Sequence, residues 1–134
     1  KLPRSKKVVR IDCVEGWSVT ALWEGILVSD LLDLAKARPA AKIAIFHAAD
    51  GYTTSLPLDY LRGKKILLAD TINGIVLPQA NGYPFQLAAE AKWGYKWIRW
   101  VTRIELSDNT AYKGYWEKQG YSNKGDASGP MFGD

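Results

Sequence analysis

The chain contains one cysteine and one histidine, Cys13 and His47, and both side chains can do chemistry. A thiolate activated by an imidazole is a nucleophile, so the two residues form a candidate catalytic couple. The alternative for Cys13 is a small buried apolar side chain at the end of a strand. A single cysteine excludes internal disulfides and multi-cysteine metal sites, and a single histidine excludes multi-histidine metal sites.

The signatures of several large enzyme classes are absent from the sequence. It has no Gly-x-Gly-x-x-Gly, no phosphate-binding loop ending in Gly-Lys-Ser/Thr, no Gly-x-Ser-x-Gly and no Cys-x-x-Cys-His haem attachment. Many nucleotide-binding enzymes, hydrolases and c-type haem proteins are thereby removed from consideration.

The net charge of +4 and the pI of about 9.2 indicate an anionic partner. One basic group lies in the first ten residues (Lys1, Arg4, Lys6, Lys7, Arg10), and another surrounds three tryptophans (Lys92, Lys96, Arg99, Arg103 around Trp93, Trp97, Trp100). A basic aromatic face can stack nucleic-acid bases. A phosphorylated cofactor and a solvated strand face with extended Lys and Arg side chains are the alternatives.

The chain of 134 residues is long enough for one domain, and its 47% hydrophobic and 24% charged residues are typical of a folded protein. We expect a domain over residues 1–124 and a flexible tail over 125–134. No apolar run reaches the roughly 18 residues that span a bilayer. No signal peptide is visible, and the compartment cannot be deduced from the cysteine content.

Most apolar segments are of strand length and are separated by turn signals. Strands are expected at 8–14, 41–47, 52–56, 65–72, 75–77, 83–89 and 97–106, with a helix from an N-cap at Ser29 to Ala37 and a helical turn over 58–62. Asn73-Gly74 is a type I′ hairpin signal. Trp17 and Trp23 are expected to pack in the core, and Asp50 to shape the turn before Tyr52. The fold class predicted is α+β, mainly β with a few short helices.

Four sequence blocks in order resemble the sulfite-oxidase-like molybdopterin oxidoreductases, including the catalytic subunit of the methionine sulfoxide reductase system. They are Cys-Val-Glu-Gly-Trp-Ser at 13–18, Phe-His-Ala-Ala-Asp-Gly-Tyr-Thr-Thr-Ser-Leu-Pro-Leu at 46–58, Leu-Pro-Gln-Ala-Asn-Gly-Tyr-Pro at 77–84 and Trp-Gly-Tyr-Lys-Trp-Ile-Arg-Trp at 93–100. Gly-Tyr-Trp-Glu at 114–117 and Gly-Tyr at 120–121 also fit. The resemblance implies the molybdopterin-binding fold of that family, mixed sheets with short helices.

The resemblance implies a molybdenum centre in which Cys13 is the single protein ligand. A soft thiolate suits a metal that a dithiolene already holds through sulfur. Tyr52 aligns with a tyrosine beside the metal, where its hydroxyl can hydrogen-bond an oxo ligand or the substrate, the alternative being a ring packed on the sheet. Cofactor contacts carried over from the family, together with neighbouring side chains, are His47, Ala48, Asn81, Gln86, Lys96, Trp97, Ile98 and Arg99.

Arg99 is expected to be the main partner of the cofactor phosphate, with Lys96 secondary. Gln86 departs from the family, which usually has arginine there, so the ordinary phosphate anchor is in doubt. Family domains usually begin with about thirty more residues, so we expect this chain to be truncated at its N-terminus. A structural role for His47 and for Asp50 stays open.

These features predict an enzyme that transfers an oxygen atom to or from a small sulfur- or nitrogen-containing substrate. Because the chain has no haem motif, the electrons require a separate partner, for which a haem protein or membrane cytochrome is the natural candidate. No nucleic-acid partner is expected. Contact with a membrane is expected only through the electron-transfer partner or through a missing anchor. The alternative is a degenerate relative that keeps the fold as a binding module without catalysis.

Overall fold

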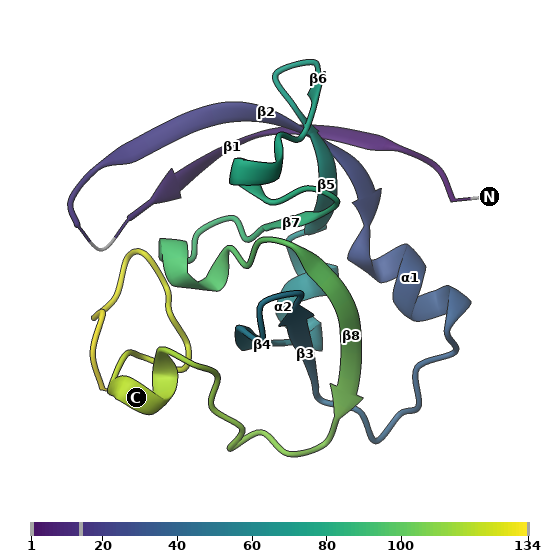
Figure 1. The fold of residues 1–134 in the computed structure, drawn as a ribbon. Helices are drawn as coiled ribbons and strands as arrows, with labels where there is room; N and C mark the ends of the chain where they lie inside the picture. Colours follow the sequence, from purple (N-terminus) through teal and green to yellow (C-terminus); the bar gives the residue numbers. More distant parts are fainter. Residues whose placement is uncertain (1, 14, 134) are drawn as a thin grey trace.

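The computed structural model describes residues 2–13 and 15–133, which form two antiparallel sheets (Figure 1). One sheet has the order β1 (Ser5–Asp12), β2 (Ser18–Leu27), β5 (Leu67–Ile72), β6 (Ile75–Val76), and β7 (Gln86–Ala88) also pairs with β5. The other has the order β4 (Thr53–Pro57), β3 (Ile43–Ala48), β8 (Val101–Ser107). The helices α1 (Val28–Leu34) and α2 (Leu58–Gly63) are short, as are the 3₁₀ turns η1 (Gln79–Asn81), η2 (Gly94–Lys96) and η3 (Glu117–Gln119). The expected α+β, mainly β fold class is confirmed.

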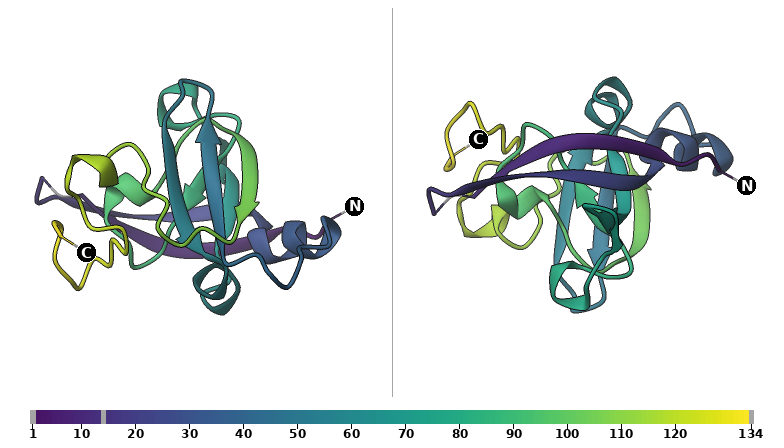
Figure 2. Two further views of the ribbon diagram at one scale, coloured as in Figure 1. Left: turned by 90° about the horizontal axis from the view of Figure 1, so that it is seen from below. Right: turned by 90° about the horizontal axis from the view of Figure 1, so that it is seen from above.

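The two sheets cross, and the core lies between them (Figure 2). Apolar side chains from both sheets and both helices fill it, among them Val9, Trp23, Val28, Phe46, Leu56, Leu61, Leu67 and Leu87. Trp23 is 4% exposed, so its predicted core position is confirmed. Trp17 is 46% exposed beside the β1–β2 turn, so its predicted core position is wrong. Its indole lies at the turn, where Nε1 donates to Glu15 Oε1 at 3.4 Å.

The β1–β2 hairpin is a long curved ribbon whose register runs from Ser5 opposite Gly25 to Asp12 opposite Ser18. Its far end packs on β5 at Gly25, where a Cβ atom would lie 2.1 Å from the carbonyl oxygen of Leu68. Only glycine allows this approach, and the strand pairing shifts register at the same point. The hairpin is thus fixed on the body at one end and presents its turn at the other.

Several predicted boundaries are wrong: the first strand begins at Ser5 and not at residue 8, and the first helix ends at Leu34 and not at Ala37. Two others are wrong for reasons of tertiary structure. The first helix begins at Val28, not after Ser29, because β2 runs directly into it and the amide of Val28 donates to the carbonyl of Ile66 at 2.9 Å. The last strand begins at Val101, not at 97, because Trp100 has a φ of 54° that interrupts the extended backbone. The Asn73-Gly74 turn is confirmed, with φ angles of 49° and 83° as a type I′ turn requires.

The C-terminal segment lies against residues 91–93. The amide of Trp93 donates to the carbonyl of Gly125 and that of Ala127 to the carbonyl of Ala91, both at 2.8 Å. Lys92, 4% exposed, pairs with Asp126 at 2.6 Å. The flexibility expected of residues 125–134 stays a prediction about motion. Within the described residues, no helix is long and apolar enough to cross a membrane.

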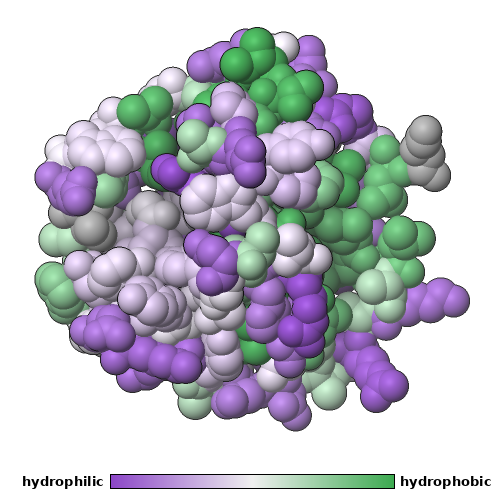
Figure 3. Space-filling model, viewed as in Figure 1, coloured by the Kyte–Doolittle hydropathy of each residue, from purple (hydrophilic) through white to green (hydrophobic). Residues whose placement is uncertain are grey.

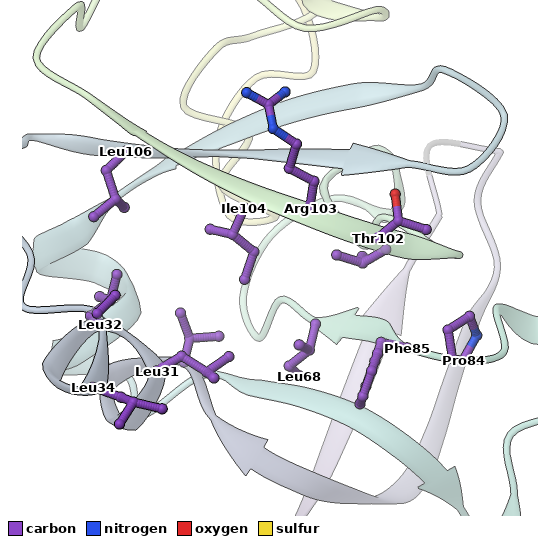
Figure 4. Close-up of a pocket in the computed structure, with 13 residues that line it drawn as sticks. Leu31, Leu32, Leu34, Leu68, Pro84, Phe85, Thr102, Arg103, Ile104 and Leu106 are labelled. Atoms are coloured by element: carbon purple, nitrogen blue, oxygen red, sulfur yellow. The ribbon is translucent and has the colours of Figure 1, made fainter.

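A cavity of about 610 Å³ opens between α1 and β8 (Figure 4). Its walls are apolar, with Leu31, Leu32 and Leu34 facing Ile104 and Leu106 across it. Arg103 is the one charged residue of the lining, and its guanidinium points away from α1. The cavity therefore offers an apolar space rather than a set of reactive side chains.

Candidate functional site

A second cavity, of about 420 Å³, lies where the turn of the β1–β2 hairpin meets the segment 94–100 and the loop after β8. Its lining includes five residues that the sequence analysis selects: Cys13, Tyr52, Trp97, Ile98 and Arg99. They come from three separate parts of the chain. On the face shown in Figure 3, weakly polar side chains gather on the side of the molecule where the C-terminal segment lies.

Cys13 is placed by the hairpin turn and by its contact with η2. Its amide donates to the carbonyl of Trp17 at 2.9 Å, and its carbonyl accepts from Gly16 at 3.0 Å. Gly94 lies directly against the strand end, because a Cβ there would be 3.6 Å from the Cα of Cys13. The thiol is free and partly exposed at the cavity wall.

Tyr52 follows the turn that Asp50 shapes, since its amide donates to Asp50 Oδ1 at 3.0 Å. Its hydroxyl donates to the carbonyl oxygen of Tyr95 at 2.5 Å. Burial, followed by the charge of Glu117, raises the pKa of Tyr52 above its ordinary value, so the phenol stays neutral. Because its single proton goes to the carbonyl of Tyr95, the hydroxyl oxygen can only accept further hydrogen bonds in this structure.

Arg99 lies with Asn81 and Gln86 around Gly82. A Cβ at Gly82 would be 3.0 Å from the Cβ of Arg99 and 3.2 Å from that of Gln86. The exposed guanidinium of Arg99 donates to the carbonyl of Ala80 at 3.2 Å, and an arginine has five N–H donors. Gln86 is buried, with Nε2 donating to the carbonyl of Trp97 at 3.4 Å. Three predicted cofactor residues therefore meet around Gly82, and of these Arg99 lines the cavity.

Five predicted residues lie outside the lining: His47, Ala48, Asn81, Gln86 and Lys96. His47, on β3, has its Nε2 3.0 Å from Oε1 of Glu105 and does not line the cavity with Cys13. The structure therefore does not form the Cys13–His47 couple. Lys96 is fully buried and pairs with Glu117 at 2.6 Å, so its ammonium does not face the cavity. Ala48 is linked to the lining residue Tyr52 through the backbone, because its amide donates to the carbonyl of Tyr52 at 2.9 Å.

The structure adds lining residues to which sequence reasoning gave no role in the site. Trp116 and Tyr121 form an aromatic wall, with ring centroids 5.5 Å apart, and Trp100 and Tyr95 continue it. The sequence signal for Trp116 and Tyr121 was the closing Gly-Tyr-Trp-Glu and Gly-Tyr motifs, which fit the family pattern without an assigned role. Glu15 also lines the cavity.

The chain supplies few metal ligands. Across residues 2–13 and 15–133, no group of three or more His, Cys, Asp or Glu side chains could hold a metal ion. A metal at Cys13 must therefore arrive with most of its other ligands.

Comparisons with known proteins agree with this donor set. A sequence model of the oxidoreductase molybdopterin binding domain matches residues 1–116. The uncharacterized oxidoreductase YuiH of Bacillus subtilis is 33% identical over 125 residues, which cover 92% of this chain and 63% of that protein. The putative protein-methionine-sulfoxide reductase subunit YedZ1 of Azospira oryzae is 35% identical over 121 residues, 90% of this chain and 46% of that protein.

The fold is similar to that of the sulfane dehydrogenase SoxCD from Paracoccus pantotrophus, with a TM-score of 0.77 at 21% identity. The match covers 90% of this chain and 35% of the SoxCD chain. The predicted molybdopterin-binding fold is thereby confirmed. The chain spans less than two thirds of the length of these relatives.

The residues of the cavity fit a molybdenum–molybdopterin cofactor. One thiol stands at the wall and no competing ligand cluster is found in the described residues, as a metal already held by dithiolene sulfurs requires. Arg99 supplies a positive charge for a phosphate, and the rings of Trp97 and Trp100 line the space between. The cofactor of this family therefore has a thiolate, a cation and an apolar enclosure available here.

Proposed function

Because the chain belongs to the oxidoreductase molybdopterin-binding family, we propose that it transfers an oxygen atom to or from a small sulfur- or nitrogen-containing substrate. Its cofactor is molybdenum held by molybdopterin. The observation that carries the proposal is that Cys13 and Arg99, far apart in the sequence, line one cavity. Such a pair can hold the metal at one end of a cofactor and its phosphate at the other.

The bound cofactor supplies two-electron redox chemistry, and the chain's own residues hold and enclose it. The Cys13 thiolate is the metal ligand, and η2 fixes its direction. Arg99 binds the phosphate, with Asn81 and Gln86 beside it. On substrate binding the Tyr52 hydroxyl turns its single proton from the carbonyl of Tyr95 to a substrate oxygen. Trp116 and Tyr121 exclude water from that side of the cavity.

The charges of the lining favour a neutral substrate over an anion such as sulfite. Glu15 and Asp50 are acidic, whereas Arg99 is the one basic residue that lines the cavity in the described part of the chain. If Arg99 binds the phosphate, the two carboxylates repel an anionic substrate. A sulfoxide, a thioether or an N-oxide meets no such barrier.

The electrons are proposed to pass to or from a separate haem protein or membrane cytochrome. Two relatives are named as a reductase subunit and as the SoxCD assembly, which supports a partner for this chain. Nucleic-acid binding is disfavoured, because Lys92 and Lys96 are buried and ion-paired and so do not form a basic stacking face.

The experiment is metal and pterin analysis of the purified chain together with its Cys13→Ala variant. We expect molybdenum and pterin fluorescence in the wild type and loss of turnover with a sulfoxide or N-oxide in the variant, because the thiolate tunes the metal. Pterin retained through its phosphate would accompany that loss. Full activity of Cys13→Ala would contradict the ligand assignment, and a protein that never binds the cofactor would favour the degenerate binding module, for which Gln86 is the evidence.

A further inference from the structure

Lys96 and Glu117 form a fully buried ion pair behind the cavity wall. Their charged atoms are 2.6 Å apart, and both side chains are 0% exposed. Lys96 Nζ also donates to the carbonyl of Ser55 at 2.8 Å, and Thr54 Oγ1 donates to Glu117 Oε2 at 2.6 Å. The pair therefore joins η2, η3 and β4, which are distant in the sequence.

On the lysine side, η2 supports both predicted reactive side chains. Gly94, two residues before Lys96, packs against the backbone of Cys13. The carbonyl of Tyr95, the preceding residue, accepts the hydroxyl proton of Tyr52. Any movement of η2 would consequently move the support of the thiol and the partner of the phenol together.

On the glutamate side, η3 carries the aromatic wall. Trp116 precedes Glu117 directly, and its ring stacks edge-on against Tyr121. Gly114 brings this loop onto β4, since a Cβ there would lie 2.4 Å from the carbonyl oxygen of Thr53. The loop thus packs closely on β4, and the ion pair of Glu117 with Lys96 holds it there.

We propose that the Lys96–Glu117 pair is a positioning device that sets the geometry of the cavity. It rests on the proposed function for what the cavity holds. The pair fixes η2 against η3, so that Cys13, Tyr52 and the aromatic wall keep their relative positions. Neither residue of the pair lines the cavity.

The chemistry of the pair argues for positioning rather than for stability alone. A buried ion pair gives little net stability, because both charges lose their hydration, and apolar residues of similar volume can replace it. What it adds is direction, since each charged group must meet named partners at hydrogen-bond distance. Glu117 Oε1 has no hydrogen-bond partner in the described structure, so the carboxylate is oriented through Oε2.

Cys13 is the chain's only thiol, and its alkylation by iodoacetamide therefore reports the geometry without any cofactor. The rate is measured in the cofactor-free full chain for the wild type, Glu117→Gln and the double variant Lys96→Met/Glu117→Met, each well below its thermal midpoint. The control is Asp126→Asn, which weakens the other pair of a buried lysine, Lys92–Asp126, also 2.6 Å long. That pair anchors the C-terminal segment, which packs on Lys96 at Gly125, but it does not join η2 to η3.

We expect Glu117→Gln and the double variant to alkylate at least about threefold faster than the wild type, because the support of Cys13 loosens and access to the thiol increases. The double variant should regain thermal stability without regaining the wild-type rate, and Asp126→Asn should alkylate at the wild-type rate. Unchanged rates in both pair variants would overturn the proposal. An equal change in the control would also overturn it, because general loosening would then explain the effect.

A second readout separates this proposal from the function it rests on. Loaded Glu117→Gln enzyme should lose activity with Cys13 still bound to molybdenum, about a hundredfold for a displacement near 1 Å. Because alkylation uses cofactor-free protein, a chain that never binds molybdenum would contradict the proposed function and still give a positioning result.

Discussion

At the scale of single residues, two polar side chains of the cavity, Tyr52 and Arg99, already donate hydrogen bonds to backbone carbonyls. Tyr52 donates its proton to a backbone carbonyl, and Arg99 has one of its donors on another. In each case one hydrogen bond to a backbone carbonyl holds the polar end of the side chain. Their roles can be separated by removing single functional groups.

Tyr52→Phe removes the hydroxyl and keeps the ring. We expect kcat and kcat/KM to fall together by about tenfold or more, because a hydrogen bond to the reacting oxygen acts in the transition state. Loss of the bond to Tyr95 should lower the free energy of unfolding by about 1 kcal/mol. Steady-state kinetics with molybdenum analysis gives the answer. Wild-type rates would assign the hydroxyl to Tyr95 alone, and loss of metal would make it a support of the cofactor.

Arg99→Ala should weaken cofactor binding by about 1.5–3 kcal/mol, roughly ten- to a hundredfold, because a charge-assisted hydrogen bond to phosphate is lost. The measurement is the pterin retained after dialysis. Arg103→Ala is the matched control, since its guanidinium contacts His47 outside the lining of the candidate site. Full retention in Arg99→Ala would place the phosphate elsewhere.

Gln86→Arg is the companion of that test. Gln86 Cβ lies beside Gly82 and Arg99, so an arginine there would begin at the proposed phosphate end. We expect tighter retention of the pterin, because a second cation is restored. Unchanged or weaker retention would show that position 86 does not serve the phosphate in this chain.

At the scale of elements, the edge strand β1 is held on its sheet by a charged contact at its beginning. Arg4 precedes β1, and its Nη1 and Nη2 donate to the two carboxylate oxygens of Asp70 on β5 at 3.0 and 2.7 Å. The hydrogen bonds from Arg4 hold the pKa of Asp70 below its ordinary value, against the opposing effect of burial. Because the hairpin carries Cys13 at its other end, this contact belongs to the support of the site.

A depressed carboxylate pKa stabilises the fold above the unfolded pKa of about 4, and that contribution is lost as the pH falls through the folded value. The thermal midpoint of Asp70→Asn should therefore lie below that of the wild type at pH 7, and the difference should shrink below pH 4. Scanning calorimetry from pH 7 to pH 2 measures it. Asp33→Asn, from the exposed Arg62–Asp33 pair, should show a smaller difference. A pH-independent gap for Asp70→Asn would contradict the assignment.

The elements that the sequence predicted best are those whose cause is local. The Asn73-Gly74 turn needs two positive φ angles, which these residue types adopt readily, and it was placed to the residue. Ser29 failed as a cap because the strand before it continues into the helix, held by a hydrogen bond to Ile66. Trp100 interrupts the last strand because its amide donates to the carbonyl of Gly82, a contact that periodicity cannot reveal.

At the scale of the whole molecule, the candidate site depends on contacts between distant segments. Residue type and family resemblance were enough to select Cys13, Tyr52 and Arg99. They could not show that Lys96 pairs with Glu117, because the strand β8 and the irregular segment 108–116 separate the two residues in the chain. The same limit applies to His47, whose side chain meets Glu105 once β3 and β8 pair.

The apolar cavity between α1 and β8 has a consequence for the behaviour of the chain in solution. β8 lies at the edge of its sheet, and Leu34 beside the cavity is 68% exposed. An edge strand next to exposed apolar side chains is a template for intermolecular association. We therefore expect this cavity, which shares no lining residue with the candidate site, to limit the solubility of the 134-residue chain. Light scattering at rising concentration should detect association whether or not molybdenum is bound.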